Sequence, residues 1–259
     1  MRHTMNLLIA NLAVADSLVL ISHSPFPIAE SNEWCKAIHF LVYLACNISV
    51  CALVALSVDR FLAIVLHTSS KAIRTTRNTS VCIVMIWILT SCHCIVEFFL
   101  FGVIHFGERK ICKFLSEDGW DSHSLAWCVV LIGYVVPVTT MAILYSLIFI
   151  HIRSAEASIR SLVSFRKSQR ILPMLIGAVS AYALCYAPMA LGYTLFLADI
   201  NIFMYEEFTL FYTTAILVNS SINPIIYGLA STKYREAFQQ MLVSLLSSIR
   251  RLPCSGSRV

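Results

Sequence analysis

The amino-acid sequence predicts an all-α fold, a polytopic bundle of six membrane-spanning helices followed by a short amphipathic helix at the membrane surface. Hydrophobic residues make up 58% of the 259-residue chain and charged residues only 13%, whereas the apolar share of a soluble domain is nearer to one half. The apolar residues form runs long enough to cross a hydrocarbon core of ~30 Å. Basic residues gather in alternate loops, which is the pattern that orients membrane helices.

These runs define the elements of the bundle. An open chain in lipid can satisfy its backbone hydrogen bonds only within helices, so each run is expected to be helical and to have the lipid bilayer as its partner. We assign residues 1–230 to the membrane bundle and residues 231–259 to an amphipathic helix and a cytoplasmic tail. The predicted spans cover about residues 5–28, 36–58, 80–104, 124–151, 171–197 and 207–229.

The basic residues orient these spans. Fifteen of the nineteen Lys and Arg residues lie on one side when the N-terminus, the 60–79 loop, the 152–170 loop and the tail are placed together. That side is expected to be cytoplasmic. The outer side keeps four basic residues and nine acidic ones, a net charge of −5. This charge favours a cationic ligand, although solvated loops account for it equally well.

The first span contains a carboxylate, Asp16, near its middle. A carboxylate at that depth needs a partner, an ion or a proton. Ser49 of the second span and Asn219 and Asn223 of the last span lie at comparable depths and offer oxygen ligands suited to Na⁺. A hydrogen-bond network without an ion fits the same residues.

The second span follows Cys35 and ends in Asp59-Arg60-Phe61. A charged pair at the edge of a membrane helix is costly, so Asp59 and Arg60 suggest a switch. Cys35 and Cys112 are the two cysteines outside the membrane on the oxidising side, which predicts a disulfide between them. Cys254, just beyond the tail helix, fits either a palmitoylation site or a free thiol.

The later spans carry prolines within them: Pro137, Pro188 and Pro224. Each proline removes a backbone hydrogen bond and kinks its helix, which creates either a hinge or a fixed packing shape. Pro224 is coupled to Asn223 before it and Tyr227 after it, so this segment is expected to rearrange as a unit. In the tail, Tyr234, Phe238 and Leu245 recur at helical spacing and predict a helix lying in the inner interface.

Taken together in order, these residues resemble a rhodopsin-class G-protein-coupled receptor along essentially the whole chain. The segment from Asp59 to Asn78 is similar to the allatostatin-A and galanin receptor group of neuropeptide receptors. The motifs that carry the resemblance are Asn11-Leu12-Ala13-Val14-Ala15-Asp16, Ser57-Val58-Asp59-Arg60-Phe61, Trp87, Pro137 with Tyr145, Cys185-Tyr186-Ala187-Pro188 and Asn223-Pro224-Ile225-Ile226-Tyr227.

The resemblance implies roles for named residues. Arg60 would leave Asp59 on activation to meet Tyr145 and the α-subunit tail of a heterotrimeric G protein, with Asn223, Pro224 and Tyr227 taking part. Asp16, Ser49, Asn219 and Asn223 match an allosteric sodium pocket, and no other cofactor is expected. Val42 stands where amine receptors carry an aspartate, which favours a peptide ligand. We expect an upper pocket lined by Phe26, Val42, Tyr43, Tyr193 and Phe196, although helix packing or the interfacial belt explains each aromatic residue better when it is taken singly.

The chain also departs from the family pattern. Tyr186 and Tyr182 stand where a tryptophan toggle and a phenylalanine are usual, near Pro188, and Ser168 stands where many members place an acid that locks Arg60. The family has seven spans and six are predicted here, since Met1-Arg2-His3-Thr4 looks like the first intracellular loop. The first helix is therefore expected to be missing, which would weaken packing and signalling.

We therefore predict a neuropeptide receptor of the plasma membrane, with a truncated, non-signalling fragment as one alternative. A six-span transporter or channel is another, but apart from Asp16 and Glu97 no acid lies clearly inside a span to line a polar path. An enzyme is not expected. Cys92, His93 and Cys94 are consecutive, so on a helix they cannot all face one metal, and common hydrolase motifs are absent from the sequence. No nucleic-acid partner is expected.

Overall fold

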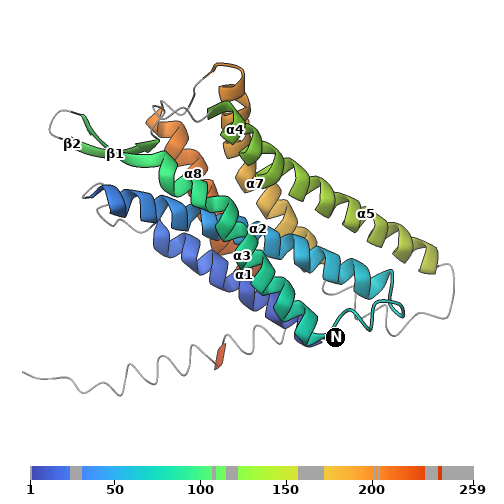
Figure 1. The fold of residues 1–259 in the computed structure, drawn as a ribbon. Coiled ribbons are helices and arrows are strands. Elements are labelled where there is room, and N and C mark those ends of the chain that lie inside the picture. Colours follow the sequence, from blue (N-terminus) through green and yellow to red (C-terminus); the bar gives the residue numbers. More distant parts are fainter. Residues whose placement is uncertain are drawn as a thin grey trace, which may run out of the picture.

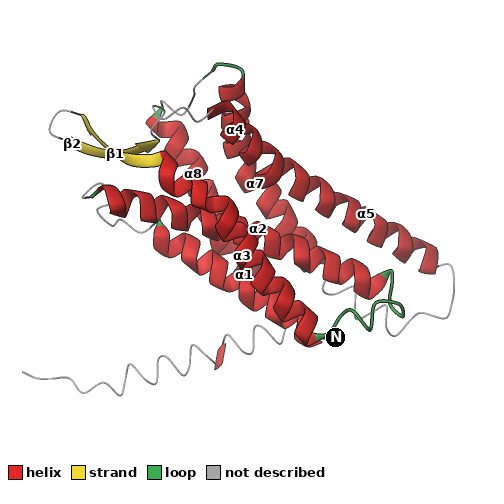
Figure 2. Cartoon of the chain, in the orientation of Figure 1, coloured by secondary structure: helices red, strands yellow, loops and turns green. Residues whose placement is uncertain are grey.

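The structure of the chain is a computed structural model that describes residues 2–23, 31–106, 109–114, 122–156, 172–200, 202, 205–230 and 239–240. Phe26, Ser168 and most of the predicted tail helix lie outside the described residues. The long helices lie side by side as a bundle, and Figure 2 shows a two-stranded hairpin at one end of it.

Figure 1 labels the elements and colours them in chain order. Ser31 caps the start of α2 by accepting a hydrogen bond from the backbone N–H of Trp34, and Thr75 caps α3 in the same way through Asn78. In chain order the elements are α1 (Arg2–Ser22), α2 (Asn32–Ile64), α3 (Thr76–Leu100), β1 (Phe101–Phe106), β2 (Arg109–Phe114), α4 (Ser122–Val130), η1 (Leu131–Val135), α5 (Val136–Glu156), α7 (Leu172–Leu197) and α8 (Glu206–Ala230).

The third predicted span is too long at its extracellular end. We expected a helix over residues 80–104, but α3 ends at Leu100 and residues 101–106 form strand β1. This strand pairs antiparallel with β2, with Phe101 opposite Phe114 and Val103 opposite Cys112. Hydropathy does not distinguish an apolar strand from the end of an apolar helix. Gly102 disfavours continuation of the helix, and the β-branched Val103 and Ile104 after it favour a strand.

The fourth predicted span, residues 124–151, is one path built from three helical segments. The α-helical hydrogen-bond ladder of α4 changes to a π-helical turn, η1, immediately before α5. Pro137 lies in the first turn of α5. Because proline cannot donate a backbone hydrogen bond and its ring crowds the preceding turn, a widened turn beside it relieves the clash.

Five of the described helical segments are long and apolar enough to cross a membrane, namely His3–Ser22, Asn32–Ile64, Thr76–Ile95, Ala126–Ser154 and Leu172–Leu197. The predicted sixth span corresponds to α8, which has 25 residues but carries the polar Asn219, Ser220, Ser221 and Asn223 in its second half. The helix α2 extends to Ile64, beyond the apolar run that ends near residue 58.

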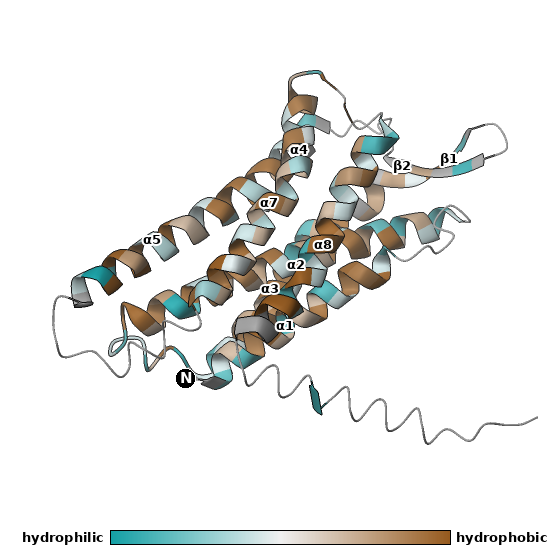
Figure 3. Ribbon diagram, turned by 180° about the vertical axis from the view of Figure 1, so that it is seen from behind, coloured by the Kyte–Doolittle hydropathy of each residue, from teal (hydrophilic) through white to brown (hydrophobic). Residues whose placement is uncertain are grey.

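The interior of the bundle lies around α2, which packs against α1, α3, α5 and α7. Fully buried residues come from several helices, including Leu12, Leu56, Met141 and Leu175. The outward faces of α3 and α5 are also apolar: Leu89, Ile143 and Ile150 are each at least 60% exposed. Figure 3 shows that hydrophobic residues predominate along α5 and α7. An apolar exterior of this extent suits lipid and not water.

Candidate functional site

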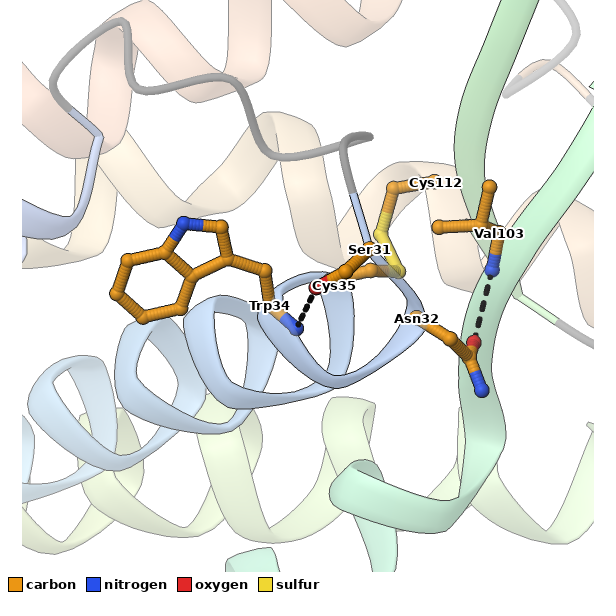
Figure 4. Close-up of a disulfide and its surroundings, with 6 residues drawn as sticks. All are labelled: Ser31, Asn32, Trp34, Cys35, Val103 and Cys112. Atoms are coloured by element: carbon orange, nitrogen blue, oxygen red, sulfur yellow. Dashed lines mark hydrogen bonds between the residues drawn. A yellow bond between two sulfur atoms is a disulfide. The ribbon is translucent and has the colours of Figure 1, made fainter.

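The extracellular end of α2 is tied to the hairpin by the predicted disulfide. Cys35 in the first turn of α2 is bonded to Cys112 in β2, with the two Cα atoms 5.7 Å apart. This confirms the sequence prediction. The side-chain oxygen of Asn32 accepts a hydrogen bond from the backbone N–H of Val103 at 3.1 Å, which adds a second link from α2 to β1 (Figure 4).

Aromatic side chains lie below this hairpin. The hydroxyl oxygens of Tyr43 in α2 and Tyr193 in α7 are 3.0 Å apart, so two of the predicted pocket residues meet across the bundle. Phe101 at the start of β1 lies 6.1 Å from the Tyr43 ring and stacks on His39, with ring centroids 3.9 Å apart. Val42, next to Tyr43, offers no charge at this level and is partly exposed.

Phe196, another predicted pocket residue, is placed beside α4. Its ring lies 5.5 Å from that of His123. The sequence analysis missed His39, Phe101 and His123. His39 precedes Tyr43 by four residues, so helical periodicity could have placed both side chains on one face of α2. Phe101 and His123 offer no such signal, because the hairpin and the start of α4 bring them in from separate elements.

The polar cluster in the middle of the bundle centres on Asp16. One carboxylate oxygen of Asp16 accepts a hydrogen bond from the Ser49 hydroxyl at 2.9 Å, and the other accepts one from the Asn223 amide at 2.8 Å. All three side chains are buried. Three helices that are distant in sequence, α1, α2 and α8, therefore converge on one carboxylate at the depth where the sequence predicts them.

Asn219, one turn before Asn223 in α8, is fully buried. Neither its side-chain oxygen nor its nitrogen has a hydrogen-bond partner within the described part of the chain, and the same is true of the side-chain oxygen of Asn223. Buried polar atoms without a partner are costly, and a bound water or ion is one way in which they are satisfied. A carboxylate, a hydroxyl and amide oxygens are donors that fit a hard cation such as Na⁺.

The cytoplasmic end of α2 carries a second charged cluster. Asp59 forms an ion pair with its neighbour Arg60. Arg74, from the loop before α3, reaches back to the same carboxylate, with its Nε 2.9 Å from one oxygen and its Nη2 3.3 Å from the other. The Thr4 hydroxyl at the start of α1 lies 3.3 Å from Asp59. Two guanidinium groups thus share one buried carboxylate.

Arg74 is a site residue that the sequence analysis missed. Its side chain is only 3% exposed, compared with 12% for Arg60. In the sequence it was simply one of the cytoplasmic basic residues. The loop is folded onto the helix by Ser70, whose hydroxyl donates to the carbonyl of Leu62 at 2.7 Å. Because the contact of Arg74 with Asp59 depends on how this loop folds, no periodic pattern in the sequence predicts it.

The remaining predicted switch residues are carried by α5, α7 and α8. Tyr145 in α5 has its hydroxyl 3.3 Å from that of Ser57, one turn before Arg60. Tyr182 and Tyr186 in α7 are buried, with ring centroids 4.6 Å apart, and Pro188 follows in the same helix. Pro224 lies inside α8 directly after Asn223. Tyr227 belongs to α8, but its side chain lies outside the described part.

Comparison with known proteins agrees with this arrangement. The chain is 31% identical to the allatostatin-A receptor of Bombyx mori, covering 93% of this chain and 71% of that protein. It is 28% identical to galanin receptor 2b of Danio rerio, with 95% and 68% covered, and 29% identical to galanin receptor type 3 of Mus musculus, with 92% and 68% covered.

These matches are to signalling receptors and not to enzymes, and they place the chain in the plasma membrane as a multi-pass protein. They favour neither a transporter nor a non-signalling fragment. The family model described as "7 transmembrane receptor (rhodopsin family)" matches residues 1–227. The chain therefore belongs to the rhodopsin family of seven-transmembrane receptors.

Proposed function

We propose that this chain is a neuropeptide receptor that transmits peptide binding at its extracellular end to a heterotrimeric G protein. The observation that supports this most is the design of α2. A single 33-residue helix carries Cys35 and Tyr43 at its outer end and Asp59 with Arg60 at its inner end. A displacement of its outer half by a ligand is therefore communicated to the charged cluster through one continuous element.

A peptide suits the outer end better than a small amine. Val42 provides no carboxylate to pair with an ammonium group, and the partly buried surroundings are aromatic. The outer loops and helix ends carry Glu33, Asp199, Glu206 and Glu207, which attract a cationic peptide from solution. The allatostatin-A and galanin receptors that the chain resembles are named for peptides.

The inner end suits a switch that exposes a cation. In the structure Arg60 is neutralised by Asp59, so its guanidinium is not available to a partner. We infer that activation separates the pair and turns Arg60 toward Tyr145 and the G protein. Arg74 stays with Asp59 in that step and keeps the buried carboxylate compensated, because an unpaired buried charge would cost several kcal/mol.

The Asp16 cluster is proposed to hold an allosteric sodium ion. Asp16, Ser49, Asn219 and Asn223 would bind it, and the ion would supply the positive charge that the buried carboxylate lacks. Hydrogen bonds from Ser49 and Asn223 hold Asp16 in place. The orphaned side-chain oxygens of Asn219 and Asn223 support an ion over a closed hydrogen-bond network.

The receptor function is tested by expressing the chain in cells and screening allatostatin-like and galanin-like peptides for G-protein activation. We expect at least one peptide to produce a saturable response. The response should be absent in Arg60→Ala, while peptide binding is kept. Arg153→Ala, an exposed basic residue at the end of α5, serves as the matched control. Ion or solute flux through reconstituted vesicles, with no peptide response at the surface, would instead support a transporter.

A further inference from the structure

The helix α3 exposes a polar side chain, His93, on its outward side. The inward side of this helix is occupied: Thr90 and Cys94 are buried, and the indole N–H of Trp87 donates to the side-chain oxygen of Asn11 in α1 at 2.8 Å. Figure 1 shows α3 in front of α1 and α2, the helices against which it packs. The His93 ring is exposed, so in one copy of the chain it faces lipid and not protein.

An ionisable ring that faces lipid is costly. His93 precedes Leu100, the last residue of α3, by about 10 Å along the helix axis. Ionisable residues within membrane helices are rare, and they almost always face the interior of a bundle or pair with another polar group. Among the side chains that the structure describes, no hydrogen bond or ion pair of His93 is found. The imidazole therefore calls for a partner outside the described part of its own chain.

A second copy of the chain supplies such a partner. Copies inserted with the same orientation are related by a twofold axis along the membrane normal, so His93 of both copies lies at one depth. A neutral imidazole has one donor and one acceptor nitrogen, so two of them are complementary. Met85, Leu89, Cys92 and His93 are all exposed, and their spacing of three or four residues places them together on what we call the α3 face. Two helices packed at a small crossing angle use this spacing.

We propose that the α3 face is a surface for self-association, at which two copies of the chain meet and His93 of one copy bonds His93 of the other. Leu89 and Met85, on the cytoplasmic side of His93, supply apolar contact area. Cys92 is small, which lets the two backbones approach closely. The α3 face contains none of the residues of the Asp16 and Asp59 clusters, so association requires neither a peptide nor a G protein.

Cys92 allows the contact to be tested in membranes. The exposed Cys82 and the tail Cys254 would be replaced with alanine, and membranes holding the full chain would be oxidised with copper phenanthroline. A disulfide requires two Cα atoms within about 7 Å, so Cys92 should yield a dimer that a reducing agent dissolves. The matched control is Cys92→Ala with Leu191→Cys, a position 55% exposed in α7, which should yield several-fold less dimer. Equal cross-linking from both positions would indicate random collision and overturn the proposal.

The role of His93 is tested by energy transfer between copies fused to donor and acceptor fluorescent proteins, reconstituted in lipid vesicles at rising ratios of protein to lipid. A hydrogen bond between membrane helices shifts an equilibrium by about threefold, so His93→Leu should weaken association by about that factor. His93→Gln keeps a donor and an acceptor and should restore it, while Leu191→Ala should change nothing. Unchanged association in His93→Leu would overturn the proposal and indicate Glu97, four residues later in the sequence, as the partner of the ring.

Discussion

Asp59 receives two guanidinium groups, one from its neighbour Arg60 and one from Arg74 fifteen residues later. One carboxylate oxygen of Asp59 accepts from both guanidinium groups, so we infer that the strength of the Asp59 to Arg60 pair depends on Arg74. Release of Arg60 is inexpensive only while Arg74 keeps the buried charge compensated. At the scale of single residues, the proposed switch is therefore a competition between two cations for one anion.

This competition predicts the effect of Arg74→Gln. Without Arg74, release of Arg60 would leave Asp59 uncompensated, so activation should become harder. We expect peptide potency in a nucleotide-exchange assay to fall roughly tenfold or more, which corresponds to ~1.4 kcal/mol or more. Arg77→Gln, an exposed position in the first turn of α3, should leave potency unchanged. Higher basal exchange in Arg74→Gln would show that Arg74 restrains the switch and does not assist it.

Asp16 gives a second prediction at this scale. If Na⁺ binds with Asp16 in the resting state, it must oppose any ligand that favours the active state. Replacing sodium with a bulky organic cation at constant ionic strength should raise agonist affinity by about fivefold or more. Asp16→Asn should remove this dependence. Agonist affinity that is insensitive to sodium in the unmodified receptor would reduce the cluster to a hydrogen-bond network.

The sequence was sufficient for the Asp16 cluster and insufficient for the Asp59 cluster. Asp16, Ser49 and Asn223 could be grouped because depth in a membrane helix follows directly from residue count. Arg74 could not, because its position depends on how the loop after α2 folds, through the Ser70 contact with Leu62. The hydroxyl of Tyr134 donates to the carbonyl of Ala183, and that of Tyr182 donates to the carbonyl of Gly133. These contacts involve the π-helical turn η1, which the sequence analysis did not predict.

At the scale of elements, the hairpin and α2 form one unit at the extracellular end. The disulfide joins residues separated by 77 positions, and Asn32 adds a hydrogen bond to β1. The hairpin is short, and an isolated hairpin of this kind is marginally stable in water. Its position above Tyr43 and His39 therefore depends on the covalent link to α2.

Breaking that link should free the hairpin and weaken peptide binding. A disulfide that closes a long loop is typically worth about 2–4 kcal/mol, so Cys112→Ser should reduce binding or surface display at least tenfold. Cys92→Ser, an exposed cysteine of α3, should have no such effect. Recovery of Cys35 and Cys112 as free thiols in non-reduced peptide mapping of surface protein would contradict the assignment.

Hydropathy located the helices better than it located their ends. The range 171–197 agrees closely with α7, because its apolar run and its helix coincide. The same criterion failed at residues 101–104, where an apolar strand continues an apolar helix. It also ended the second span at residue 58, although α2 continues to Ile64. The length of an apolar run reflects the thickness of the hydrocarbon core. The helix α2 continues past the end of its apolar run and includes Asp59 and Arg60 of the charged cluster.

At the scale of the whole molecule, several polar side chains lie in the interior and large apolar side chains lie on the exterior. Charged and amide side chains such as Asp16, Asp59 and Asn219 are buried, while large apolar side chains cover the outer faces of α3 and α5. Polar groups that face one another between helices give the bundle distinct interior contacts that lipid cannot supply. Changes of conformation are thereby concentrated in a few polar contacts, and a ligand needs to bias only those contacts.

The central claim is that a peptide at the outer end of α2 releases Arg60 at its inner end. The most direct test measures nucleotide exchange on purified heterotrimeric G protein with the receptor reconstituted in lipid nanodiscs, with and without the peptide found in the screen. We predict that the peptide accelerates exchange by the unmodified receptor and not by Arg60→Ala, while both bind the peptide with similar affinity. Saturable peptide binding that leaves exchange unchanged in the unmodified receptor would contradict the account.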